Sequence, residues 1–134
     1  MKFFLPVLIS LLGAALGIFF IFKGIDKHFL NPCPVYDAKS GITQSYITLI
    51  TTFCESGFMF IVGLLEILSG LLLIFPKTRL TGTFIIMPII ITIFLIHLLI
   101  DNRPYELIES GIPLAATLMI FSFHKKQWKY IIAR

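Results

Sequence analysis

Long apolar stretches separated by short polar segments make up nearly all of this 134-residue chain. Each stretch is about as long as the ~20-residue helix that crosses a hydrocarbon core of ~30 Å. We therefore expect one all-α domain, an integral membrane four-helix bundle. The predicted spans are residues 5–24, 56–75, 80–100 and 105–123.

The connection between the first two spans is about thirty residues long, which is unusual for a small bundle. Its second half repeats apolar residues at helical spacing, from Ile42 through Tyr46 and Ile50 to Phe53, with threonines on the other face. This pattern predicts a short amphipathic helix in the first outer loop. The helix either lies on the outer surface or continues into the second span as one long helix, since periodicity does not determine its tilt.

Composition supports a membrane protein. Hydrophobic residues make up 57% of the chain and charged residues 13%, whereas soluble domains contain about 25% charged residues. The net charge of +4 comes from basic residues spread over the ends of the spans. Because nucleic-acid-binding proteins gather such residues in one stripe, we expect the lipid bilayer as a partner and no nucleic acid.

The distribution of lysine and arginine predicts the orientation. With both termini in the cytoplasm, seven basic residues face that side and four face the outside, as the positive-inside rule requires. No acidic residue falls on the cytoplasmic side. Trp128 and Tyr130, which stand among lysines after the last span, predict an anchor at the membrane interface.

Glu66 is a lone carboxylate near the middle of the second span. A charge at the bilayer centre costs at least ~2.5–3.5 kcal/mol, so we expect Glu66 to face the protein interior and to have a partner there. Glu55 precedes it by eleven residues, close to three helical turns, which places both carboxylates on nearly one face.

Further polar side chains are predicted near the outer ends of the spans. His97 and Asp101 stand four residues apart and are therefore neighbours, and Lys23 ends the first span. One interpretation is a polar pocket that opens outward and consists of Glu66, His97, Lys23, Glu55 and Asp101. In the other, Lys23 extends to the interface and Glu66 is a hydrogen-bonded packing residue.

The sequence indicates no catalytic or metal site. His28, His97 and His124 lack the spacing of metal ligands, and haem-attachment, phosphate-loop and nucleophile-elbow motifs are absent.

Cys33 and Cys54 both fall on the outer side, where an oxidising compartment permits a structural disulfide. Sequence does not supply the geometry that such a bond requires, so the pairing stays open. Without a Cys-x-x-Cys motif, a redox-active pair is not expected.

Two segments carry a resemblance to a known family. Residues 20–27, FIFKGIDK, resemble the end of the first helix of DoxX-like membrane proteins. Residues 62–73, VGLLEILSGLLL, followed by Thr78 and Arg79, resemble that family's most distinctive segment, and His97 fits its third helix. The resemblance implies a four-helix bundle in the cytoplasmic membrane of a bacterium. It also implies relatives such as a subunit of a thiosulfate:quinone oxidoreductase and proteins associated with thiol or oxidant-defence enzymes.

These observations favour a quinone- or lipid-facing component of a membrane redox or stress-related system, centred on Glu66. We do not expect it to be an enzyme on its own, although it suits a subunit of a quinone-linked oxidoreductase with a membrane or peripheral redox partner. An assembly factor is the alternative, with the small residues Gly13 and Gly17 and the amphipathic segment docking on a larger membrane protein. A small permease ranks third and requires an oligomer.

Overall fold

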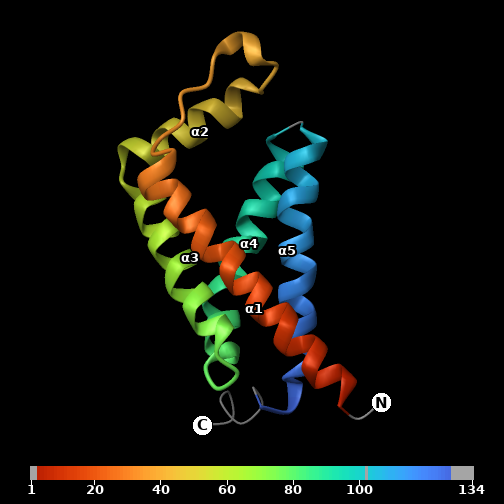
Figure 1. Cartoon of the computed structure of the whole chain (residues 1–134). Helices are drawn as coiled ribbons and strands as arrows, with labels where there is room; N and C mark the ends of the chain where they lie inside the picture. Colours follow the sequence, from red (N-terminus) through yellow and green to blue (C-terminus); the bar gives the residue numbers. More distant parts are fainter. Residues whose placement is uncertain (1–2, 102, 128–134) are drawn as a thin grey trace.

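The structure, a computed structural model, describes residues 3–101 and 103–127, and all regular elements in these two ranges are helical (Figure 1). The prediction of an all-α chain is confirmed for this part of the protein. These elements are five α-helices and two short helical turns between α1 and α2, a π-helical turn (η1) and a 3₁₀ turn (η2). In chain order they are α1 (Phe4–Ile25), η1 (Asp26–Leu30), η2 (Ala38–Ser40), α2 (Gln44–Glu55), α3 (Phe58–Ile74), α4 (Arg79–Leu99) and α5 (Pro104–Phe123).

Three helical segments are long and apolar enough to cross a membrane. They are α1 together with η1 (Phe4–Leu30), α4 and α5, and a fourth span is present if α2 and α3 count as one bent span. α1, α3, α4 and α5 begin and end within two residues of the four predicted ranges. Their outward faces carry exposed large apolar side chains, among them Leu11, Phe22, Leu64 and Leu71. Such a surface suits lipid rather than water.

A sharp corner separates α2 from α3. The two helices meet at 81° across Ser56 and Gly57. Gly57 has a φ of 75°, a left-handed conformation that glycine adopts without a steric penalty. Of the two alternatives that the periodicity left open, one continuous straight helix is therefore wrong.

α1 and α3 pack closely because glycines on the two helices face each other. A Cβ atom added at Gly17 would lie 2.6 Å from the carbonyl oxygen of Gly70, and one at Gly24 would lie 2.5 Å from that of Gly63. Small residues let helix backbones approach in this way. Gly17, one of the two glycines noted in the sequence, therefore serves packing within the chain.

α3 ends against a buried arginine at the start of α4. The Arg79 side chain donates from Nε to the carbonyl oxygen of Leu73 at 3.0 Å and from one terminal nitrogen to that of Ile74 at 3.3 Å. These carbonyls lack partners within the helix, and a cation also complements the negative end of the helix dipole. Gly13 of α1 makes room for the guanidinium, since an added Cβ would lie 2.3 Å from Arg79 Nε.

α4 and α5 pack on each other and separate from the α1–α3 pair toward the end of the molecule where α2 crosses (Figure 1). We call this the α2 end. α1 begins and α5 ends at the opposite end. The core between the helices includes Phe20, Leu73, Ile86 and Ile120, all fully buried. The chain termini, with the predicted anchor residues Trp128 and Tyr130, lie outside the described residues.

Candidate functional site

A cavity of about 590 Å³ lies where the α1–α3 pair separates from the α4–α5 pair at the α2 end. Its volume falls within the ~300–1,000 Å³ of small-molecule sites. Most of the wall is apolar, with aromatic rings from α1, α2 and α3 and isoleucines from α4. Charged or ionisable side chains also line it: Lys23, Asp26, Lys27, Glu66, His97, Arg103, Glu106 and Glu109.

Glu66 forms an ion pair with a lysine of η1 at the cavity wall. Its side chain is 2% exposed, and Lys27 of η1 donates from Nζ to both carboxylate oxygens, at 2.8 and 3.0 Å. The expected interior position and partner of Glu66 are thus present, and the partner is Lys27. Side chains tilt toward the N-terminus of their own helix. Because α1 and α3 run antiparallel, the two side chains lean toward each other.

Lys23 was the expected neighbour of Glu66, but it forms its ion pair with a different carboxylate. Its ammonium group donates to the carboxylate of Glu109 in α5. Lys23 at the end of α1 therefore connects to α5, and Lys27 in η1 connects to α3. This pairing also ties the α1–α3 unit to α5 across the wide end of the cavity.

The π-helical turn η1 carries Lys27 into the site. Its hydrogen bond from the Asn31 amide to the Asp26 carbonyl, 2.8 Å long, spans five residues instead of four. Such turns are rare and occur often at functional sites. Sequence reasoning missed the role of Lys27 because apolar periodicity does not reveal a widened turn.

A second polar cluster borders the cavity between α4 and α5. His97 Nδ1 hydrogen-bonds to Asp101 at 2.9 Å, as their spacing predicted. Arg103 donates to Asp101 from Nε and from a terminal nitrogen, at 3.1 and 2.9 Å, and pairs with Glu106 at 3.3 Å. Asp101 lies behind the wall with a fully buried side chain and orients the two groups that face the cavity.

The charge state of Asp101 follows from its partners. Burial opposes ionisation, but hydrogen bonds from Arg103 and His97 outweigh this effect and hold the pKa of Asp101 below its usual range. The same carboxylate raises the pKa of the Arg103 guanidinium. Asp101 and Arg103 are therefore a stable ion pair at neutral pH.

α2 covers the cavity at the α2 end. Tyr46, Ile50 and Phe53 stand on one face of α2, and all three line the cavity. The Tyr46 ring lies 5.6 Å from the His97 ring, and the Arg103 guanidinium lies 5.1 Å from the centre of the Tyr46 ring, close enough for a cation–π contact. The polar cluster thus has an aromatic cover.

Glu55 does not belong to the cavity. It is exposed at the end of α2 and is not among the lining residues. The predicted common face with Glu66 required a continuous helix, and the corner at Gly57 breaks it. Of the five candidate pocket residues, the structure brings Glu66, His97 and Lys23 together, places Asp101 directly behind them and leaves Glu55 apart.

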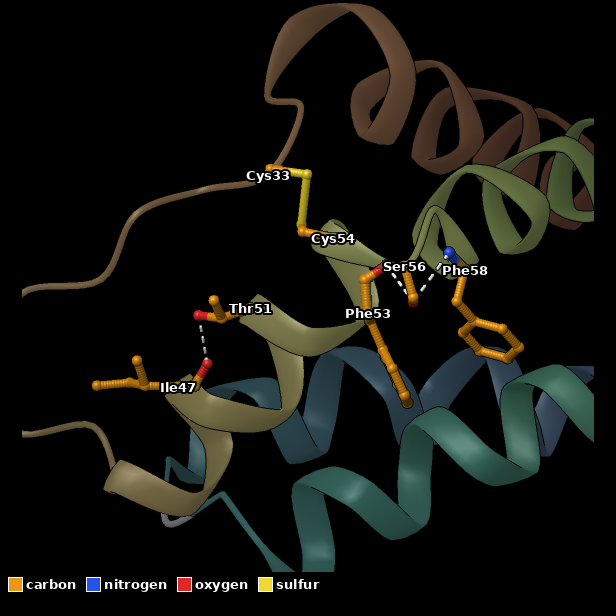
Figure 2. The surroundings of a disulfide bond; sticks show 7 residues. All are labelled: Cys33, Ile47, Thr51, Phe53, Cys54, Ser56 and Phe58. Atoms are coloured by element: carbon orange, nitrogen blue, oxygen red, sulfur yellow. Dashed lines mark hydrogen bonds between the residues drawn. A yellow bond between two sulfur atoms is a disulfide. The ribbon is translucent and has the colours of Figure 1, made fainter.

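Cys33 and Cys54 form a disulfide, with Cα atoms 5.5 Å apart. Cys33 follows η1 and also lines the cavity, and Cys54 lies in the last turn of α2 (Figure 2). The bond joins the end of η1 to the helix that covers the cavity. The sequence left this pairing open.

The three histidines occupy different surroundings. His28 packs against Phe60 with ring centres 4.3 Å apart, His97 faces the cavity, and His124 is buried beside the Ile120 carbonyl. Within the described residues, His28 Nε2 is the buried side-chain polar atom without a hydrogen-bond partner, and nothing in the structure explains it. The same residues contain no group of three or more ligands suited to a metal ion.

No protein-family model, curated protein or solved structure matches this chain. The resemblance to DoxX-like proteins rests only on the sequence, on segments 20–27 and 62–73 with Thr78, Arg79 and His97, and stays a prediction.

Proposed function

We propose that this protein binds the headgroup of a quinone in the cavity at the α2 end, as a DoxX-like component of a membrane redox or stress-related system. The observation that carries the proposal is the ion pair of the buried Glu66 carboxylate with the partly buried Lys27 ammonium, at a cavity whose wall is mostly apolar. An intramembrane ionisable pair beside a cavity is more often functional than structural.

The chemistry of the cavity suits a quinone. Partly exposed aromatic side chains in the wall, such as Phe19 and Phe53, offer flat surfaces for a ring. The Lys27 ammonium can donate a hydrogen bond to a quinone carbonyl, and Glu66 can exchange a proton when the ring is reduced or oxidised. A lipid headgroup would use the same donors and acceptors, and the experiment below distinguishes the two.

Within this proposal α3 is the fourth span, and α2 lies at the outer surface of a bacterial cytoplasmic membrane. The distribution of basic and acidic residues between the two ends of the molecule supports this orientation. The described basic residues next to the start of α4 and the end of α5 are Lys77, Arg79, Lys125 and Lys126, and no acid accompanies them. All seven acids lie toward the α2 end or at Glu66. The positive-inside rule then places both termini in the cytoplasm.

The proposed role is that of a partner-dependent component. A membrane or peripheral redox protein would supply or take the electrons, and this chain would hold the quinone and its proton. In the alternative, an assembly factor, the helix face with Gly13 and Gly17 would dock on a larger membrane protein. Inside this chain, Gly17 packs on Gly70 and Gly13 on Arg79, so that face is already occupied.

The test is purification in lipid nanodiscs, identification of co-purified quinone by mass spectrometry, and titration with decylubiquinone. We expect bound quinone, and we expect the Glu66→Gln variant to bind decylubiquinone at least about tenfold more weakly, a loss of ~1.4 kcal/mol. The matched control is Glu55→Gln, because Glu55 is exposed and lies outside the cavity. Equal binding by both variants, or recovery of phospholipid alone, contradicts the quinone proposal.

A further inference from the structure

α2 covers the cavity but is held by few contacts. Its inward face carries the lining residues Tyr46, Ile50 and Phe53, whereas its threonines Thr48, Thr51 and Thr52 are exposed. Apart from its contacts with neighbouring α3, α2 packs only weakly against the other helices. An element with so few tertiary contacts belongs to the least stable part of a fold, unless something ties it down.

Besides the contacts of Tyr46 with His97 and Arg103, two ties hold α2, one at each end. At its start, Thr43 donates a 2.7 Å hydrogen bond to the carbonyl oxygen of Ile100, which ends α4. At its end, Cys54 is bonded to Cys33, just beyond η1. The first tie is a single hydrogen bond that water can replace, whereas the second is covalent.

A corner suited to bending lies next to the disulfide. Gly57, in a left-handed conformation, separates α2 from α3 three residues after Cys54. The rings of Phe53 and Phe58 meet across this corner with centres 4.8 Å apart. In Figure 2 the disulfide and the Phe53 ring leave the last turn of α2 in opposite directions. The disulfide thus joins the end of α2 to the segment after η1, and the Phe53–Phe58 contact is what packs across the corner itself.

Cys33 has the properties of a reducible cysteine. It is exposed, and its φ of 53° is a left-handed conformation that residues other than glycine rarely adopt. Exposed disulfides are among those that are readily reduced and serve regulation. The same residue borders the cavity, so a change at this bond acts directly on the site.

We propose that the Cys33–Cys54 disulfide is a redox latch, and that its reduction by a dithiol protein frees α2 to swing about Gly57 and open the cavity. This inference rests on the proposed function for what the cavity admits. One thiolate of the dithiol attacks Cys33 Sγ, which forms a mixed disulfide and releases Cys54 as a thiolate. The second thiol then displaces Cys33, so the reductant becomes a disulfide and both cysteines become thiols after protonation.

Hydrogen–deuterium exchange in nanodiscs tests the latch without any ligand. We compare the oxidised protein, the protein reduced with a dithiol, and the Cys33→Ser/Cys54→Ser double variant. In the two forms without the bond, α2 amides should exchange at least about tenfold faster, whereas α3 amides near Gly70 stay unchanged. Adding the dithiol to the double variant should change nothing further. Equal exchange of α2 in all three forms overturns the latch.

The association rate of decylubiquinone separates this inference from the proposed function. The latch predicts that the double variant binds decylubiquinone at least about tenfold faster than the oxidised protein. Equal rates in the two forms overturn the latch and leave quinone binding intact. If α2 loosens but neither form binds decylubiquinone, the latch stands as a device of the fold and the proposed function fails.

Discussion

Lys27 donates from its Nζ to both carboxylate oxygens of Glu66, and the two residues stand 39 positions apart in the chain. The pair joins η1 to the middle of α3 inside a region that we assign to the membrane. Removing one member of such a pair leaves the other charge buried without compensation, which is more damaging than removing both. Stability and ligand binding therefore depend on the pair as a unit.

The first prediction concerns the ion pair. Lys27→Met should lower the free energy of unfolding by about 3 kcal/mol, because it leaves the Glu66 carboxylate buried alone. Adding Glu66→Gln to that variant should restore part of the loss. Denaturation in mixed micelles measures both effects, with Lys39→Met as the control because Lys39 is exposed. Additive losses in the double variant would show that the pair is not coupled.

The second prediction concerns the close contact of α1 with α3. Gly17→Leu should destabilise the protein by about 3 kcal/mol, because its Cβ would lie 2.6 Å from the backbone oxygen of Gly70 and the helices must move apart. Ala15→Leu is the matched control, since Ala15 lies on an exposed face of the same helix. Thermal unfolding in detergent compares them. An undiminished midpoint for Gly17→Leu would contradict the packing described here.

The third prediction is a pH dependence. Because the folded-state pKa of Asp101 is lowered, this carboxylate contributes stability above its unfolded pKa of ~3.9, and the contribution disappears as the pH falls through the folded value. Asp101→Asn should therefore cost about 1–3 kcal/mol at pH 7. The difference from the native protein should shrink below about pH 4.

Unfolding curves between neutral and acidic pH measure this difference. Glu55→Gln supplies the effect of removing one exposed carboxyl. A gap between Asp101→Asn and the native protein that stays constant down to acidic pH would mean that the Arg103–Asp101 pair does not set the charge state of Asp101.

The helices and the position of Glu66 were predictable because each depends on local information. Apolar length predicts a helix that can span a bilayer, and a lone carboxylate in such a helix must turn inward. The His97–Asp101 contact was predictable for the same reason, since residues four apart in a helix are neighbours.

The partners of the lysines were not predictable in this way. Lys23 and Lys27 lie one turn apart, and which of them reaches Glu66 depends on the π-helical turn and on the register of α1 against α3. The only trace of that register in the sequence is that the glycines of the two helices are equally spaced. Gly17 and Gly24 stand seven apart on α1, as Gly63 and Gly70 do on α3. The corner at Gly57 was likewise hidden, because glycine is also compatible with a continuous helix.

Photo-crosslinking with an azido-quinone in native-like nanodiscs tests the central claim most directly. Peptide mapping by mass spectrometry should place the adducts on cavity residues of separate helices, such as Phe19, Met59 and Ile93. Excess decylubiquinone should suppress these adducts, and the Glu66→Gln variant should lack them. Adducts confined to outward-facing residues such as Leu64 and Leu71, or unaffected by competition, would contradict quinone binding at the Lys27–Glu66 pair.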